Sequence, residues 1–232
     1  MPPIEVADLA GVVYSAGKVF DGLRTGRVDT ENFLRSGNLR GVTSRSDLAL
    51  LQDLRDVAQF VIDHANDQID AAYVRAINAQ LTRTAALHPG QLRADEQNIG
   101  VPTRYGRHEP AALTNETLQE IVAHAIAGDD PLESALELFV ALAKAQPFED
   151  GNKRTALFVA DGLLIGAGSQ LMLTVPVDDQ DPAVAGSFND LLARAYVHNE
   201  PSGVKNLLRE RGFANLDCSH DAENNRRSTR RA

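Results

Sequence analysis

The chain has 232 residues, of which 43% are hydrophobic and 24% are charged, so it is long enough and apolar enough to bury a core. Its formal net charge of −9 argues against a general nucleic-acid or anionic-membrane surface, and leaves room for a local basic pocket that binds a small phosphate ligand. The single cysteine, Cys218, excludes a disulfide framework or a thiolate zinc site within one chain.

The N-terminal sequence does not have the pattern of a signal peptide, because Glu5 and Asp8 stand where cations are expected. The most apolar run, ALFVADGLLIGAG, is too short to span a bilayer and contains Asp161. We therefore expect a soluble protein of a reducing compartment, most simply the cytoplasm, with no membrane partner and no nucleic-acid partner.

Residues 1–45 mix glycines with charged residues and are expected to form a helical or irregular N-terminal extension. Leucines and valines then recur at helical spacing, which predicts a helix that is capped by Ser46 or Asp47 and runs to about residue 65. A second stripe predicts a helix from Asp67 to Thr82.

A long connection follows, LHPGQLRADEQNIGVPTRYGRHEPAALT, with several glycines and prolines and a strand-like portion only around Asn98 to Thr103. Connections of this length between helices are usually functional or disordered.

Helical periodicity then resumes and continues almost to the C-terminus. The expected helices are Asn115–Ala127, Pro131–Ala145, a buried helix from Asn152, and two shorter ones over 182–198 and 201–210. From about Ala214 the periodicity stops, so residues 213–232 are predicted to be a disordered polar tail. The sequence therefore predicts an all-α fold with at most a small β-hairpin, and a main domain over 46–212.

The stretch AQPFEDGNKRTALF, residues 145–158, joins two of these helices through a turn crowded with charge. Gly151 suits a tight turn or a close approach of backbone to ligand. The first amides of the second helix, helped by Lys153 and Arg154, form an anion site, and Glu149 and Asp150 offer oxygen ligands for Mg²⁺. These parts describe a nucleoside-polyphosphate site that is not a P-loop, although a charged helix–loop–helix corner without a ligand explains the same residues.

The segment resembles the signature of the Fic/Doc family, His-x-Phe-x-Asp/Glu-Gly-Asn-Gly/Lys-Arg. Phe148 and Asp150 match in order, followed by Gly151–Arg154. Upstream, HPGQLRADEQNIG resembles the family's Pro-Gly-x-x-Arg segment, which leads into a flap; here the flap covers about 88–110. The resemblance extends over roughly residues 20–200 and implies a Fic-like helical domain with a small hairpin flap.

The resemblance also implies a function. Family members typically transfer AMP from ATP to a hydroxyl side chain of a target protein, whereas Doc-like members transfer phosphate. By position, Asp150 would hold Mg²⁺, Gly151 and Asn152 would cradle the phosphates, Arg154 would grip them with help from Lys153, and Phe148 would anchor the core. The flap, with Asn98, Ile99, Gly100 and Val101, would pair with the backbone of the target segment.

Gln146 stands where the family has the histidine that removes the proton from the target hydroxyl. A neutral amide has no lone pair that titrates near neutral pH, so Gln146 cannot be a general base, and weak or absent transfer is expected. The residue fits either a natural nucleotide-binding relative with little transfer or a substitution that silences a toxic enzyme. A non-catalytic protein that binds nucleotide or a partner is a further alternative.

Two other departures concern regulation and the transferred group. Leu157 replaces the second arginine of many members, as in the Doc branch, so phosphate transfer stays open; the long flap favours AMP transfer. Many members also carry an inhibitory helix, and the resemblance leaves open an inhibitory helix or an antitoxin as a partner. Thr30-Glu31-Asn32 lies in the region of that helix, but Arg27 replaces its Ser/Thr, and a solvated segment is the simpler interpretation of Glu31.

Overall fold

A computed structural model describes residues 3–84, 87–97 and 99–216 of the chain. The N-terminal half contains η1 (Val6–Leu9), α1 (Ala10–Asp21), α2 (Arg27–Ser36), α3 (Arg45–Asp63), α4 (Ala71–Asn78), β1 (Val101–Thr103), β2 (Gly106–His108) and α5 (Asn115–Ala125). The C-terminal half contains α6 (Pro131–Ala145), α7 (Asn152–Gly166), β3 (Leu171–Leu173), α8 (Ala183–Val197), α9 (Ser202–Arg211) and β4 (Phe213–Asn215).

Helix α7 lies at the centre of the fold and packs against α6, α4, α3, α1 and β3. Its hydrophobic residues are buried around nearly the whole circumference, including Leu157, Phe158 and Leu164, as expected of a helix enclosed by other helices. The segment that precedes α7 is therefore anchored at the middle of the molecule.

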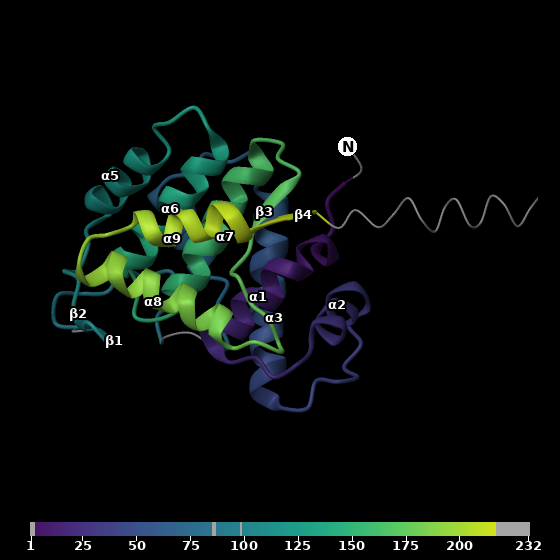
Figure 1. The fold of residues 1–232 in the computed structure, drawn as a ribbon. Helices are drawn as coiled ribbons and strands as arrows, with labels where there is room; N and C mark the ends of the chain where they lie inside the picture. The colour runs from purple at the N-terminus through teal and green to yellow at the C-terminus, as the bar shows by residue number, and fades with distance from the viewer. Residues whose placement is uncertain (1–2, 85–86, 98, 217–232) are drawn as a thin grey trace, which may run out of the picture.

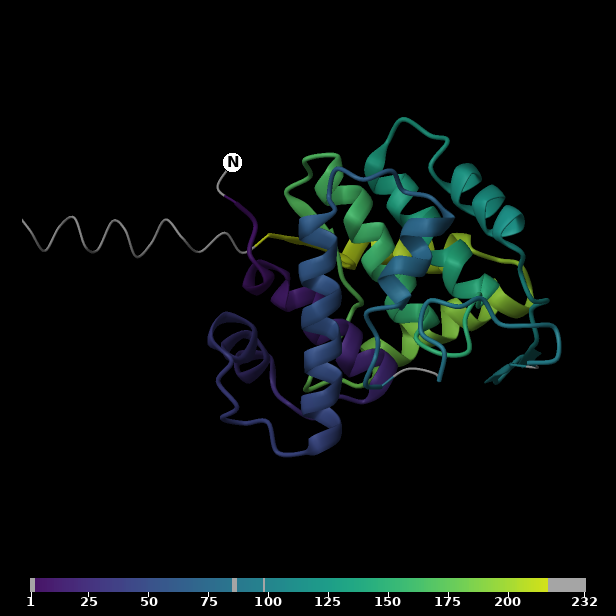
Figure 2. The ribbon, with the colours of Figure 1, turned by 180° about the vertical axis from the view of Figure 1, so that it is seen from behind.

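The N-terminal region packs onto this core. Helix α1 buries Val12, Val13 and Ala16 in the same apolar cluster as α7, and its last residue, Asp21, ends beside the start of α7. The long helix α3 packs against α7 and α1 and lies in front of them in Figure 2, which shows the molecule from behind.

Two short antiparallel strand pairs complete the described structure. β1 pairs with β2, with Val101 opposite His108 and Thr103 opposite Gly106, at the edge of the molecule beside α8. β3 pairs with β4, with Leu171 opposite Asn215. The predicted all-α class with a small hairpin is confirmed, and β3–β4 is a second pair that the sequence pattern did not indicate.

Several predicted helix limits agree with the structure, and two do not. The predicted Pro131–Ala145 helix is α6 as observed. The cap predicted at Ser46 or Asp47 is wrong: Ser44 caps α3 by accepting from the Asp47 amide. The helix predicted from Asp67 to Thr82 is shortened to α4, because the Asp70 carboxylate caps the Tyr73 amide and so begins the helix later.

The disordered tail predicted from residue 213 begins too early. Phe213–Asn215 form β4, and Leu216 is buried and donates its amide to the Gln170 carbonyl. Pairing with β3 orders this segment, and a strand of three residues shows no periodicity in sequence. The rest of the predicted tail, 217–232, lies outside the described residues, and within them no helix combines the length and apolar character needed to cross a bilayer.

Candidate functional site

The candidate site forms where the loop between α6 and α7 meets the first turn of α7. Gly151 is the N-cap of α7 in the left-handed region, with φ of 73°, and no side chain caps this N-terminus. A Cβ at Gly151 would lie 2.4 Å from the Leu81 Cδ1 atom, so glycine is needed here to let the loop pack closely on the segment after α4. The first turn of α7 therefore presents backbone N–H groups and the positive end of the helix dipole.

Asn152 braces the loop from within. Its Oδ1 accepts from the Phe148 amide and its Nδ2 donates to the Phe148 carbonyl, both at 2.8 Å, while the Phe148 ring is 1% exposed in the core. The Asn152 side chain is thus used to shape the loop, and its backbone N–H, in the first turn of α7, is the group left for a ligand.

Arg154 is a buried cation, 2% exposed, that is held by three elements. Its Nη1 donates to Thr84 Oγ1 at 2.7 Å, its Nε lies 3.3 Å from Asp21 Oδ2 at the end of α1, and its Nη2 lies 3.6 Å from Asp150 Oδ1. A buried, positioned guanidinium suits bidentate recognition of phosphate.

Asp150 stands at the rim of the site with 57% of its side chain exposed. Its Oδ1 accepts from the Gly151 amide at 2.5 Å, which fixes the carboxylate beside the start of α7. No cluster of three or more metal-ligating side chains occurs among the described residues. One exposed carboxylate fits Mg²⁺ that is bound mainly through phosphate oxygens and water.

Glu149, the other candidate carboxylate, also lines the cavity at this loop, but both of its oxygens already have partners. Its Oε1 accepts from Gln97 Nε2, and its Oε2 lies 3.3 Å from His88 Nδ1. Both partners come from the connection that leads into the flap. Glu149 therefore ties that connection to the motif, and Asp150 is the carboxylate left at the rim.

Burial changes the charge properties of the site. It lowers the pKa of Lys153, whose ammonium lies 5.1 Å from the centre of the Phe20 ring, while Asp21 and Asp150 partly counteract that shift. Burial raises the pKa of Asp21, opposed by Arg154. Lys153 and Arg154 are thus both partly removed from water, which strengthens the attraction of these cations for an anion.

Gln146 closes α6 in a left-handed conformation, with φ of 48°, and is 6% exposed. Its side-chain Nε2 donates to the Ala143 carbonyl, and its backbone carbonyl accepts from Arg93 Nε at 2.9 Å. Arg93 also donates to the Pro110 and Ala111 carbonyls. Arg93, the arginine of the Pro-Gly-x-x-Arg segment, thus ties the motif to the end of the flap.

Two adjoining cavities open at this loop. The first, of about 210 Å³, is lined by Phe20, Asp21 and residues of the flap and the motif that the sequence predicted; these are Ile99, Gly100, Val101, Gln146, Glu149, Asp150, Gly151, Asn152, Lys153 and Arg154. The second, of about 450 Å³, shares Val101 and Lys153 with it and lies between β1, α1 and α8. Asn98, predicted for the flap, lies outside the described residues.

The flap is anchored on α8. Asp190 pairs with Arg104 Nη1 at 2.9 Å and accepts from the Tyr105 hydroxyl at 2.9 Å. His108 Nε2 lies 2.7 Å from the Lys144 carbonyl at the end of α6. The hairpin thereby forms one wall of the larger cavity.

Two residues discussed from the sequence lie away from the cavities. Leu157, at the position of the family's second arginine, is fully buried in the core. Glu31 pairs with Arg35 at 2.6 Å on the exposed side of α2, as a solvated segment would. Asp21 and Phe20, by contrast, were missed, because nothing in the periodicity of α1 indicates that its end reaches the site.

Comparison with known proteins agrees with this arrangement. The model of the Fic/DOC family matches residues 68–164, which include α4, the flap, the motif and most of α7. No protein of curated function matches the chain. The matched region belongs to the Fic/DOC family.

Solved structures of Fic proteins share the fold at low sequence identity. A Fic-domain-containing signaling protein from Bacteroides thetaiotaomicron is 15% identical with a TM-score of 0.62, over 90% of this chain and 86% of that one. Fic-1 (residues 134–508) from C. elegans is 17% identical with a TM-score of 0.60, over 85% and 58%. A Fic family protein from Desulfovibrio desulfuricans is 13% identical with a TM-score of 0.57, over 90% and 66%.

Proposed function

We propose that the chain is a Fic-type transferase scaffold that binds ATP with Mg²⁺ and is built to transfer AMP to a hydroxyl side chain of a target protein. The observation that carries the proposal is Arg154, a buried guanidinium beside the uncapped N-terminus of α7, with the exposed Asp150 carboxylate at the rim. A cation, free amides and a carboxylate at one cavity are what a magnesium–polyphosphate ligand requires.

In this proposal the two cavities bind different parts of ATP. The smaller one, at the α7 N-terminus, suits the phosphates, and the larger one, between the flap and α8, suits the nucleoside. Asp150 would hold Mg²⁺, which supplies charge neutralisation of the phosphates when it is bound. Lys153 lies on the border shared by the cavities and adds charge between them.

Transfer would proceed by attack of the target hydroxyl oxygen on the α-phosphorus. The new O–P bond forms as the bond to the pyrophosphate oxygen breaks, and pyrophosphate leaves with the electron pair. The hydroxyl proton must pass to a base, and Gln146, a neutral amide bonded to the Ala143 carbonyl, cannot take it. Binding and orientation are therefore retained while the proton-transfer step is unassisted.

The backbone conformation at residue 146 is compatible with histidine, the general base of the family. A φ of 48° is uncommon for glutamine, whereas histidine is several-fold enriched in this region. Gln146→His is expected to fold without rearrangement and to raise transfer by about 10²–10⁴-fold, the usual contribution of a general base.

The test compares this chain with its Gln146→His form in a cell lysate that contains Mg²⁺ and ATP labelled in the α- or the γ-phosphate. Label carried onto protein from the α position, absent from a Gln146→His/Arg154→Ala control, is the expected result. Label carried from the γ position alone would mean phosphate transfer and overturn the AMP assignment. No transfer from either position, with ATP binding intact, would identify a binding protein.

A further inference from the structure

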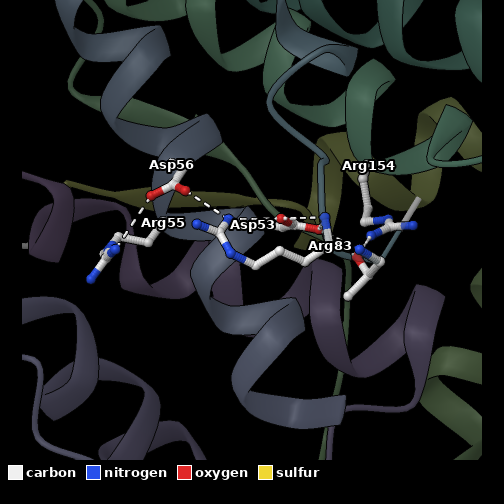
Figure 3. Close-up of polar contacts among 6 residues, drawn as sticks. Asp53, Arg55, Asp56, Arg83 and Arg154 are labelled. Carbon is white, nitrogen blue, oxygen red and sulfur yellow. Dashed lines mark hydrogen bonds and ion pairs between the residues drawn. The ribbon is translucent and has the colours of Figure 1, made fainter. Parts of the chain in front are cut away.

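The segment after α4 places one hydroxyl group between a buried carboxylate and the phosphate-site arginine. Thr84 Oγ1 accepts from Arg154 Nη1 at 2.7 Å and donates to Asp53 Oδ2 at 2.7 Å. Asp53 belongs to α3 and Arg154 to α7, so Thr84 bridges two helices at this point. Figure 3 shows the Asp53 carboxylate bonded to Arg83, with Arg154 nearby.

Asp53 is fully buried, and its carboxylate accepts hydrogen bonds from Arg83 and Thr84. Its carboxylate takes the Arg83 amide at 3.1 Å, the Arg83 Nη1 at 3.0 Å and the Thr84 amide at 2.7 Å, besides the Thr84 hydroxyl. Arg83 is held in turn by Asp56 at 2.8 Å. A buried carboxylate with this many donors fixes the backbone and the side chain of Thr84 together.

The hydrogen-bond directions follow from the chemistry of the groups. An ionised carboxylate only accepts, so the single hydroxyl proton of Thr84 must point to Asp53. A lone pair of the same oxygen then faces outward, and a guanidinium only donates, so Arg154 is its natural partner. Asp53 thereby determines, through Thr84, that the group facing Arg154 is an acceptor.

We propose that Asp53, acting through Thr84, is a positioning residue that holds the Arg154 guanidinium at the phosphate cavity. What Arg154 binds rests on the proposed function; how Arg154 is held does not. Among the hydrogen bonds and ion pairs of this guanidinium in the described structure, Thr84 is the uncharged partner, and the others are Asp21 and Asp150. Without the Thr84 hydroxyl, the guanidinium would be held only by these two carboxylates, which line the cavity and compete with a phosphate for it.

Thr84→Val removes the hydroxyl at constant shape, and Thr84→Ser keeps it, which makes a matched control. The first readout uses the ligand-free chain: side-chain ¹H–¹⁵N NMR signals of Arg154, assigned by their loss in Arg154→Ala. We expect slowly exchanging signals in the unmodified chain and in Thr84→Ser, and shifted or broadened signals in Thr84→Val. Unchanged Arg154 signals in Thr84→Val would overturn the positioning role.

The second readout is affinity for Mg-ATP and for AMP by calorimetry. Thr84→Val is expected to weaken ATP binding about ten-fold, the value of one hydrogen bond to a charged group, and to leave AMP binding nearly unchanged. In an Arg154→Ala background, Thr84→Val should cause no further loss. An equal loss in both backgrounds, or an equal loss for ATP and AMP, would show a structural role only and overturn the proposal.

Asp53→Asn extends the test, because an amide in place of the carboxylate offers a donor toward Thr84 and disturbs the hydroxyl direction. It should reproduce the Thr84→Val loss of ATP affinity; full ATP affinity in a folded Asp53→Asn chain would contradict the role of Asp53. If Asp53→Asn does not fold, Thr84→Val still decides the role of the hydroxyl. If the unmodified chain binds no Mg-ATP, the proposed function fails, and the NMR readout still decides how Arg154 is held.

Discussion

The ion pair between Asp21 and Arg154 sets a carboxylate against the cation that the phosphates are proposed to use. The Asp21 carboxylate lies 3.3 Å from Arg154 Nε and lines the smaller cavity. Phosphate and carboxylate therefore compete for one guanidinium. Asp21→Asn removes the negative charge, keeps the side-chain shape, and is expected to strengthen Mg-ATP binding.

The size of the gain follows from this geometry. At 3.3 Å the Coulomb attraction is about 5 kcal/mol at an effective dielectric constant of 20. Much of it is offset by desolvation, since burial raises the pKa of Asp21 while the Arg154 charge only partly reverses that rise. A net competition of about 1–2 kcal/mol corresponds to roughly a 5–30-fold gain in affinity for Asp21→Asn.

Isothermal titration calorimetry with Mg-ATP measures this gain. Glu31→Gln is the matched control, because it also removes one carboxylate from an ion pair with an arginine, but on the exposed face of α2. Glu31→Gln should bind ATP as the unmodified chain does. Equal affinities for Asp21→Asn and the unmodified chain, or an equal gain in Glu31→Gln, would refute competition at Arg154.

The pH dependence gives a second check with a defined sign. Above the raised pKa of Asp21 the carboxylate is charged and competes; as the pH falls through that pKa, Asp21 is neutralised and competition is lost. The advantage of Asp21→Asn is therefore expected to be largest at high pH and to shrink as the pH falls. Titration of the ATP phosphates affects both chains alike, so it cancels in the ratio.

Three further predictions concern the core, the turn and the flap. Asp161 is fully buried, and its pKa is raised well above the ordinary range, so its contribution to stability is full at low pH and is lost as the pH rises toward the folded-state pKa. Asp161→Asn keeps an acceptor for the Leu173 amide, and its gain in stability over the unmodified chain, measured by urea unfolding, should grow with pH. Parallel pH profiles of the two chains would contradict this. Gly151→Ala should destabilise the chain by about 1–3 kcal/mol in the same assay, because of its positive φ and the contact with Leu81, and an unchanged urea midpoint would argue against this. Asp190→Ala should speed amide exchange in Val101–His108, measured by mass spectrometry, and leave α7 unchanged; equal exchange would show that Asp190 does not hold the flap.

The helix–loop–helix corner of the site could be predicted because its information is local. Pro131 at the first turn and Asp130 as the cap define the start of α6, and an apolar stripe defines its length. Gly151 marks the turn, and the charges that crowd around it lie within a few residues in sequence. The proposed phosphate-binding loop therefore appears in the sequence as one continuous motif.

The surroundings of that loop could not be predicted, because they depend on tertiary packing. Asp21 is the last residue of an amphipathic helix in which no residue pattern indicates a ligand. Asp53 lies outside the apolar stripe of α3, so the sequence pattern suggests exposure to solvent, whereas in the structure it is covered by residues 83–84. The three-residue strand β4 is too short to show periodicity. In each case a partner distant in sequence decides the role of the residue.

Calorimetry of ATP binding to the unmodified chain and to Arg154→Ala, with and without Mg²⁺, tests directly whether the α7 N-terminus is a nucleotide site. We predict saturable binding that requires Mg²⁺, weakens in Asp150→Asn and weakens much more, while staying measurable, in Arg154→Ala. Binding that is equally strong in Arg154→Ala, or no binding at millimolar ATP by a folded unmodified chain, would contradict the assignment of the α7 N-terminus as a nucleotide site.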